Sequence, residues 1–424
     1  MMKKTKCHIN MKSTEIIEIM APAGSYESLS AAIQGGAHSI YFGIEGLNMR
    51  ARSANNFTIA DLHEISRICR DNGLKSYLTV NTIIYESDLS LMRAIIDAAK
   101  EARISAIIAA DVAALTYANS IGVEVHLSVQ LNITNIESLK FYAQFADVVV
   151  LARELNLEQV RAIHEQIIAQ DIRGPKGELI RIEMFAHGAL CMAVSGKCYL
   201  SLHEMNASAN RGACNQICRR GYVVRDKESD IELEIDNQYI MSPKDLKTIG
   251  FLPQMLEAGV EVFKIEGRAR GAEYVRTVCE CYKAALAAYE SGMWSDEKVA
   301  AWDKSLARVF NRGFWNGYYL GQRLGEWSDQ YGNQATEKKV YIGKVINYFS
   351  KLGVAEFLME TGSLSTGEQV LITGPTTGAL FLTAEDIRVD LISVETTAKG
   401  ERFSMRVPEK VRPSDKLFVL TLQK

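Results

Sequence analysis

The sequence predicts an α/β protein: a (β/α)8 barrel of the TIM type with a smaller all-β domain after it. Eight short runs rich in β-branched residues alternate with amphipathic stretches between residues 16 and 289. Each run is almost continuously apolar, as expected of parallel strands covered on both faces. A doubly wound sheet is the alternative, but the turn after the first run, APAGSYESL, lacks the GxGxxG pattern.

The barrel elements follow from the order of these runs along the chain. The predicted strands are IEIMA (17–21), SIYFG (39–43), KSYLTV (75–80), SAIIAA (105–110), VEVHLSV (123–129), DVVVLA (147–152), RIEMFAHG (181–188) and VEVFKIEG (260–267). Helical patterns fill the gaps. In the stretch 58–73, for example, a threonine caps the start and a glycine closes the end.

The later part of the chain divides into a tryptophan-rich linker and the all-β domain. We expect the barrel domain to span 1–292, the linker 293–336 and the β domain 337–424. The linker holds all four tryptophans, Trp294, Trp302, Trp315 and Trp327. We expect them to pack the two domains together, and a platform for stacked bases is the alternative. The β domain should form a small barrel from the runs KVYIGKVINYF, GVAEFLME, EQVLITGP, ALFLTAEDI, DLISVETT, FSMRVPE and KLFVLTLQK.

Composition is that of an ordinary globular protein, with 424 residues, of which 47% are hydrophobic and 23% charged. The formal net charge of −3 means that any contact with nucleic acid must come from a local basic patch. The N-terminus lacks the apolar run of a signal peptide, and no apolar window suits a membrane span. We therefore expect a cytoplasmic protein without membrane contact, whose thiols stay reduced.

Four cysteines crowd one segment, residues 187–222, which we expect to form a long insertion after the seventh strand. Cys191, Cys198, Cys214 and Cys218 are separated by six, fifteen and three residues. Clustered cytosolic thiols indicate a metal site. Only the last pair has the spacing usual for zinc, whereas an iron-sulfur cluster tolerates wider gaps. Spacing alone leaves both metals open.

The insertion also carries basic residues close to the thiols: Lys197, Arg211, Arg219 and Arg220. Cations of this kind would stabilise a negatively charged cluster and would serve as a footprint for nucleic acid. A solvated basic loop explains them equally well.

In a barrel, active residues come from the C-terminal ends of strands and the loops after them. Candidate polar residues at such positions are Asn81, Gln130, Arg153, His187, Lys264, Glu266 and Arg268. His187 would be the base of a cysteine protease with Cys191, but that hypothesis leaves three thiols unexplained. The simplest interpretation of His187 is a histidine satisfied at a strand end.

Several motifs together identify a family resemblance that covers essentially the whole chain. They are MAPAG, HLSVQ, LARELNLEQV, HGALCMAVSGKCYLS followed by RGACNQICRRGY, MSPKDL and KIEGRARGAEYV. The chain resembles the collagenase-like peptidase family U32, whose assigned members act mainly as hydroxylation factors. Length and the C-terminal β domain favour the branch of bacterial tRNA hydroxylation proteins P. That branch forms 5-hydroxyuridine at the wobble position of tRNA, with prephenate as the implied hydroxyl source.

The resemblance also implies a cofactor and site residues. In the branch that acts on a ubiquinone precursor, four cysteines hold a 4Fe-4S cluster, and the motif maps onto Cys191, Cys198, Cys214 and Cys218. It therefore implies this cluster in place of zinc. We expect the catalytic residues to be His187, Lys264 and Glu266. A bound dicarboxylate needs cationic clamps, and the expected substrate-binding residues are Arg50, Arg52, Asn81, Gln130, Arg153 and Arg268.

The resulting prediction is a tRNA hydroxylase whose partners are tRNA and a small dicarboxylate such as prephenate. The alternatives are a collagenase-like peptidase, a hydroxylase of another RNA or of a ubiquinone precursor, and a non-catalytic RNA-binding protein with a structural metal. The sequence leaves open whether a partner subunit or a homo-oligomer is required.

Overall fold

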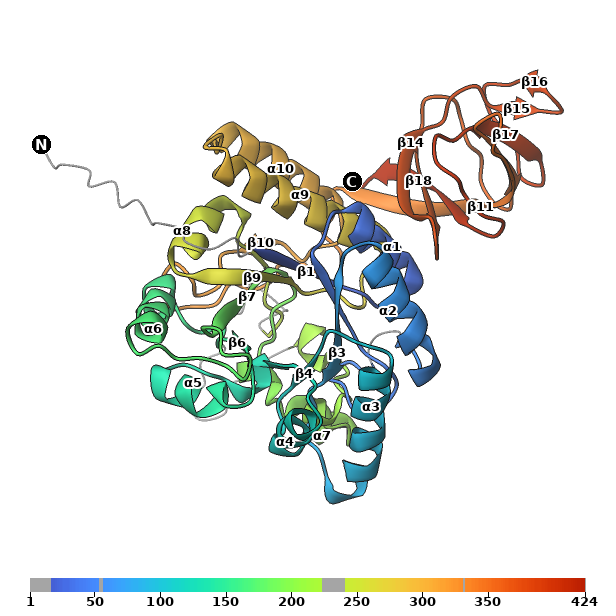
Figure 1. The fold of residues 1–424 in the computed structure, drawn as a ribbon. Helices are drawn as coiled ribbons and strands as arrows, with labels where there is room; N and C mark the ends of the chain where they lie inside the picture. The colour runs from blue at the N-terminus through green and yellow to red at the C-terminus, as the bar shows by residue number, and fades with distance from the viewer. Residues whose placement is uncertain (1–16, 53–55, 223–240, 331, 424) are drawn as a thin grey trace, which may run out of the picture.

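The computed structural model describes residues 17–52, 56–222, 241–330 and 332–423. It confirms the predicted barrel: parallel strands pair in sequence order, and β9 pairs with both β7 and β1 to close the ring (Figure 1). The barrel strands are β1 (Glu18–Pro22), β2 (Ser39–Phe42), β3 (Lys75–Val80), β4 (Ala106–Ala109), β5 (Val125–Leu127), β6 (Val148–Val150), β7 (Arg181–Gly188) and β9 (Val260–Ile265). Each lies inside or within one residue of its predicted run.

Helices surround the barrel and begin at capping residues that the sequence supplies. They are α1 (Tyr26–Gln34), α2 (Leu62–Asp71), α3 (Leu89–Glu101), α4 (Val112–Ser120), α5 (Ile136–Ala143), α6 (Leu157–Ala169), α8 (Leu252–Glu257) and α9 (Ala272–Glu290). The Ser25 and Asp111 side chains accept backbone N–H bonds at the starts of α1 and α4, and Asn156 forms a capping box with Gln159 on α6. None of the helices in the described ranges is long and apolar enough to cross a bilayer.

The barrel has two apolar layers. The larger lies between strands and helices and includes Ile19, Phe42 and Leu78. The smaller, with Tyr41, Tyr77 and Val262 among its members, comes from alternate strand positions and fills the barrel interior. Polar groups at the two ends of this interior are therefore separated by a packed plug.

Two further strands extend the barrel sheet beyond the ring. β8 (Asp245–Lys247) pairs antiparallel with the end of β7, and β10 (Phe314–Trp315) pairs parallel with β8. The cysteine-rich segment lies between β7 and β8 and contains the short helix α7 (Leu200–Met205). Its position confirms an insertion after the seventh barrel strand.

The tract 293–336 contains regular structure of its own. α10 (Asp296–Arg308) packs against α9, and Trp302 on it lies against Trp294 with ring centroids 5.4 Å apart. Trp315 belongs to β10 and Trp327 lies beside β8, forming a bridge to Pro243. The four tryptophans thus divide into an outer pair and a pair next to the end of β7.

The C-terminal domain is an eight-stranded antiparallel sheet, as the sequence predicts for an all-β unit. Its strands are β11 (Glu337–Phe349), β12 (Val354–Met359), β13 (Gln369–Gly374), β14 (Gly378–Thr383), β15 (Arg388–Val389), β16 (Ile392–Ser393), β17 (Arg402–Arg406) and β18 (Lys416–Leu422). Figure 1 shows it beside α1 and α9, and β14 contacts both helices.

Candidate functional site

A cavity of about 190 Å³ lies at the C-terminal ends of the barrel strands. Its floor comes from strand positions such as Tyr41 on β2, Thr79 on β3, Phe185 on β7 and Lys264 on β9. The insertion and the tract around Trp315 supply the walls. The geometry therefore places the cysteine segment at the face where barrel enzymes carry their active residues.

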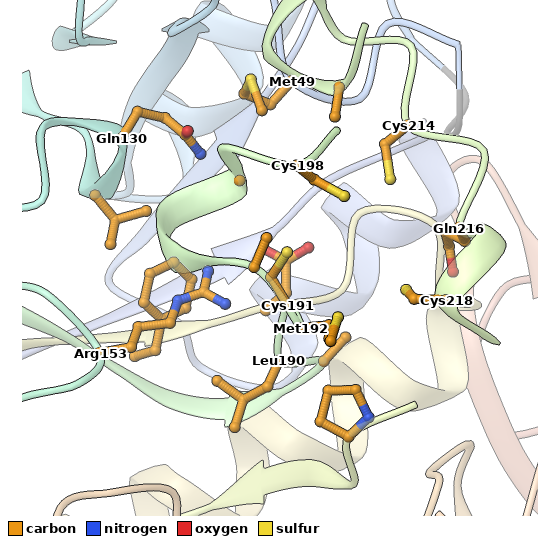
Figure 2. A pocket seen from close by; sticks show the side chains of 18 of the residues that line it. Met49, Gln130, Arg153, Leu190, Cys191, Met192, Cys198, Cys214, Gln216 and Cys218 are labelled. Atoms are coloured by element: carbon orange, nitrogen blue, oxygen red, sulfur yellow. The ribbon is translucent and has the colours of Figure 1, made fainter. Parts of the chain in front are cut away.

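All four clustered cysteines line this cavity, and Figure 2 shows their sulfur atoms turned towards a common space. Gly212 explains how the insertion reaches it. Its φ is +80°, and a Cβ there would come within 2.2 Å of the Asn48 carbonyl oxygen. The Arg52 N–H also donates to the Gly212 carbonyl, 3.2 Å away, so the second half of the insertion is held against the loop after β2.

The thiols interact electrostatically. Burial, together with the other three cysteines, raises the pKa of Cys218 to about 11, although Arg219 opposes the shift. Within the described ranges, no three His, Cys, Asp or Glu side chains are arranged to hold one metal ion. The candidate donor set is therefore the four thiols that line one shared space.

Arg219 ties the two ends of the cysteine segment together. Its guanidinium donates to the Leu190 carbonyl at 2.7 Å, to the Ser242 hydroxyl at 3.0 Å and to the Pro243 carbonyl. Leu190 precedes Cys191, and Arg219 itself follows Cys218. Burial lowers the pKa of Arg219 to about 10, which leaves it charged at neutral pH.

Glu266 is the centre of a charged network on the cavity floor. Arg50 Nη2 lies 3.2 Å from Glu266 Oε1, and the Tyr41 hydroxyl donates to Glu266 Oε2 at 2.9 Å. Burial opposes ionisation, but Arg50, Arg153 and Arg268 outweigh it and hold the pKa of Glu266 below its usual range. Glu266 is thus an ionised carboxylate in the cavity.

Lys264 and Arg268 are fixed by other partners. The Lys264 ammonium donates to Glu183 Oε1 at 2.7 Å, and this pair is almost fully buried. Arg268 donates to the Asn48 side chain at 2.8 Å and to the Thr79 hydroxyl at 3.3 Å. Both cations have their charged groups committed within the protein.

Three further predicted residues line the same cavity. Asn81 donates to the Ser128 hydroxyl at 3.3 Å and accepts the Met49 N–H at 3.2 Å. In Figure 2, Gln130 and Arg153 lie nearer to Cys191 than to Cys214 and Cys218. The Arg153 guanidinium stacks over the Phe185 ring, with its central carbon 3.7 Å from the ring centroid. The structure thus brings together Arg50, Asn81, Gln130, Arg153, Lys264, Glu266, Arg268 and the four cysteines.

His187 and Arg52 are the predicted residues that the structure does not bring to the cavity. Arg52 is exposed. His187 is buried among the rings of Tyr274, Tyr282 and Phe314, and burial lowers its pKa to about 3. A β-bulge causes this orientation, since Phe185 and His187 pair with the adjacent residues Lys264 and Ile265. His187 is therefore neutral and faces α9.

Some cavity residues were not predicted from the sequence. Tyr41 lies in an apolar strand run, where the alternation of side chains was the available signal. Trp315, Tyr318 and Trp327 enter from the tract after the barrel, far along the chain. The sequence around them predicted only that the tryptophans either pack the two domains together or form a platform for stacked bases.

Comparisons with known proteins agree with this architecture. The sequence pattern described as Peptidase family U32 matches residues 24–329. A Porphyromonas gingivalis protein named collagenase is 69% identical over 95% of this chain and 97% of its own length. The Bacillus subtilis tRNA hydroxylation protein P1 is 31% identical over 84% of this chain and 83% of its own. The Escherichia coli 23S rRNA 5-hydroxycytidine C2501 synthase is 33% identical over 65% of this chain and 40% of its own.

Proposed function

Because this chain belongs to peptidase family U32, we propose that it is an RNA hydroxylase that forms 5-hydroxyuridine at the wobble position of tRNA. Prephenate is the proposed hydroxyl source, and a 4Fe-4S cluster the proposed cofactor. The observation that carries the proposal is the cavity itself, which combines four thiols with a strongly cationic lining. Relatives named for tRNA and rRNA hydroxylation support the reaction class.

The donor set fits a polynuclear cluster. Thiolates that bind separate irons of a cube lie farther apart than thiolates around one zinc ion. Four thiols that line one cavity and turn towards a shared space fit such a cube. Cys191, Cys198, Cys214 and Cys218 would hold it, and the cluster would supply redox chemistry when bound.

The charge of the cavity fits an anionic co-substrate. Among the described lining residues, five cations face two carboxylates: Arg50, Arg153, Arg219, Lys264 and Arg268 against Glu154 and Glu266. A dicarboxylate would reduce this excess of positive charge. A wobble base is unpaired in its loop, so moving it into the cavity costs little.

Glu266 would act on the uridine. Transfer of the hydroxyl group to C5 would break the C–O bond of the hydroxyl donor and the C5–H bond of the base. The donor would keep the C–O electron pair and be reduced, and the C5 hydrogen would leave as a proton that needs an acceptor. Glu266 is ionised, oriented by Tyr41 and Arg50, and lines the cavity. It is the carboxylate best placed to accept this proton.

Mass spectrometry of tRNA nucleosides tests the proposal. A strain lacking this gene and any paralogue should lose 5-hydroxyuridine and its derivatives. The wild-type gene should restore them, as should Cys69→Ser, a control on α2 away from the cavity. Cys198→Ser should restore neither the modification nor the iron content of the purified protein. Unchanged nucleosides in the deletion strain would refute the proposal.

The second candidate is a collagenase-like peptidase, favoured by the name of the 69% identical relative. The site offers little support for a thiol nucleophile. No histidine is among the described residues that line the cavity, and the pKa of Cys218 is raised to about 11. Incubation of the purified protein with gelatin and collagen tests this alternative directly. Cleavage of these proteins by the Cys198→Ser variant, together with loss of cleavage in the Glu266→Gln variant, would favour the peptidase.

A further inference from the structure

Two N–H groups in the cavity wall lack a hydrogen-bond partner among the described residues. They are Nε of Arg153 and Nε1 of Trp315, both inaccessible to solvent. A buried donor without an acceptor costs free energy, so each such group in a folded protein needs an explanation. Both groups are donors, which means that a ligand serving them must present acceptor oxygens.

Arg153 and Trp315 belong to connected parts of the same wall. Arg153 stacks over Phe185 on β7, and the Tyr319 hydroxyl donates to the Phe185 carbonyl at 3.0 Å. The Leu157 N–H donates to the Tyr319 carbonyl at 2.9 Å, which attaches the segment after Trp315 to the start of α6. Trp315 itself packs edge-on against Tyr318, with centroids 5.3 Å apart.

Arg153 differs from the other cations of the cavity because its buried Nε has no hydrogen-bond partner among the described residues, although its charge acts on Glu266. Arg50 pairs with Glu266, Lys264 with Glu183, and Arg268 donates to Asn48 and Thr79. Arg219 is held by backbone carbonyls. Arg153 has a ring beneath its guanidinium and makes no hydrogen bond or salt bridge within the described ranges. A planar cation with free donors selects a carboxylate.

We propose that Arg153 and Trp315 form a carboxylate-binding subsite for a small organic acid, in which the guanidinium and the indole N–H donate to carboxylate oxygens. The inference rests on the proposed function, in which this acid is the co-substrate. It assigns a ligand role to Trp315, which lies on β10, outside the barrel ring, and lines the same cavity as Arg153.

Calorimetric titration of the purified protein with prephenate tests the subsite. Arg153→Met keeps a hydrocarbon chain over Phe185 and should raise the Kd at least about tenfold, because a charge-assisted hydrogen bond is lost. Trp315→Phe keeps an aromatic ring against Tyr318 and should raise it roughly threefold or more. Thermal melting establishes that both variants are folded.

Matched controls lie outside the cavity. Arg93 lies on α3, where its guanidinium sits over the Tyr117 ring, and Trp302 lies on α10 against Trp294. Arg93→Met and Trp302→Phe should bind prephenate with unchanged affinity. Phenylpyruvate, with a single carboxylate, should bind the wild type more weakly and should still be sensitive to Arg153→Met.

Three outcomes would overturn the subsite. They are unchanged prephenate affinity in folded Arg153→Met and Trp315→Phe, absence of wild-type binding to prephenate and phenylpyruvate alike, and an equal loss of prephenate affinity in the control variants Arg93→Met and Trp302→Phe. Failure of the proposed function looks different. The deletion strain would retain 5-hydroxyuridine, while the two variants would still lose affinity for the acid.

Discussion

At the scale of single residues, a buried and a partly buried carboxylate at opposite ends of the barrel are both kept ionised by their neighbours. Glu266 faces the cavity among arginines. Glu18 lies at the start of β1, accepts a 2.7 Å bond from the Tyr77 hydroxyl and lies 3.2 Å from Lys75 Nζ and 3.5 Å from Arg181 Nη1. Burial alone would neutralise either group, so the surrounding donors and cations decide the charge.

Glu18 should make stability depend on pH. Burial opposes its ionisation, but Lys75, Ser39 and Tyr77 lower its pKa from 4.5 to about 2. A lowered pKa stabilises the fold above the unfolded pKa, and this stability is lost as the pH falls towards 2. The contribution at neutral pH is roughly 3 kcal/mol. Urea unfolding should show Glu18→Gln less stable than the wild type at pH 7, with a smaller difference at pH 3.5.

The matched control for this experiment is Glu64→Gln. Glu64 is exposed on α2 and pairs with Arg67, an arrangement that contributes little to stability. The unfolding free energy of the Glu64→Gln variant should equal that of the wild type at each pH. If the unfolding free energy of Glu18→Gln lies below that of the wild type by the same amount at pH 7 and pH 3.5, the assignment of an ionised Glu18 is contradicted.

The buried pair Lys264–Glu183 predicts a recoverable loss of stability. Lys264→Met leaves the fully buried Glu183 carboxylate without its cation, which should cost roughly 3–5 kcal/mol of unfolding free energy. Adding Glu183→Leu removes the unpaired charge and should restore a large part of the loss. Denaturant unfolding of the single and double variants measures both effects. A double variant as unstable as Lys264→Met alone would rule out charge burial as the cause.

At the scale of elements, the cysteine segment depends on contacts that fix its two ends and its middle. Arg219 joins the loop before Cys191 to the strand region at Pro243, and Gly212 is pressed against the loop after β2. Both contacts lie within the protein, since the Arg219 guanidinium donates to the Leu190 and Pro243 carbonyls and Gly212 packs with its backbone against Asn48, so they position the thiols without requiring a ligand. The segment is short of regular structure, with α7 as its only α-helix in the described part and three single-turn 3-10 helices beside it, Val194–Gly196, Ala209–Arg211 and Ile217–Arg219.

Loss of the Arg219 tether should loosen this segment. Arg219→Met removes three hydrogen bonds, including those to the Leu190 and Pro243 carbonyls, and should speed amide hydrogen exchange across 190–219 roughly tenfold or more. The neighbouring exposed residue supplies the control, since Arg220→Met should exchange like the wild type. Equal exchange in the two variants would show that the tether does not hold the segment.

The elements also show how far sequence patterns reach. Buried parallel strands are recognisable because their apolar runs are continuous, and polar residues at their ends, such as Asn81 and Lys264, were placed correctly by topology. β8 and β10 have three and two residues and pair only with distant segments, so no local pattern marks them. His187 illustrates a different limit, since a bulge reverses the side-chain alternation that its position in β7 implies.

At the scale of the whole molecule, the β domain is joined to the barrel by a small set of specific contacts. The Gln34 amide on α1 donates to the Thr377 carbonyl at 2.9 Å and accepts the Ala379 N–H at 3.0 Å. The Arg276 side chain on α9 donates to the Ala379 carbonyl, and Lys339 lies 2.8 Å from Glu273. The turn before β14 thus sets how the two domains meet.

Gly378 should be decisive for this interface. Its φ is +65°, and a Cβ would come within 2.3 Å of Gln34 Oε1 and 3.0 Å of the Ala31 nitrogen. Gly378→Ala must displace Gln34 and break both of its bonds, so we expect faster hydrogen exchange in α1 and β14. Gly367→Ala is the control. Gly367 has a φ of +91°, and an added Cβ would meet no atom within 4 Å, so this variant shares with Gly378→Ala only the cost of placing alanine at a positive φ, about 1 kcal/mol. Similar exchange in both variants would contradict this role.

The wall formed by Trp315, Tyr318 and Trp327 has a consequence for biosynthesis. These residues lie more than a hundred positions after Cys198, yet they line the same cavity. On the ribosome, the barrel strands and all four cysteines are synthesised before this wall exists. A group delivered to the thiols at that stage would face solvent, and only the late arrival of the tract would enclose it. If the thiols hold the proposed cofactor, the order of translation gives the nascent chain an open period for loading it, which ends when Trp327 pairs with Pro243, just before β8.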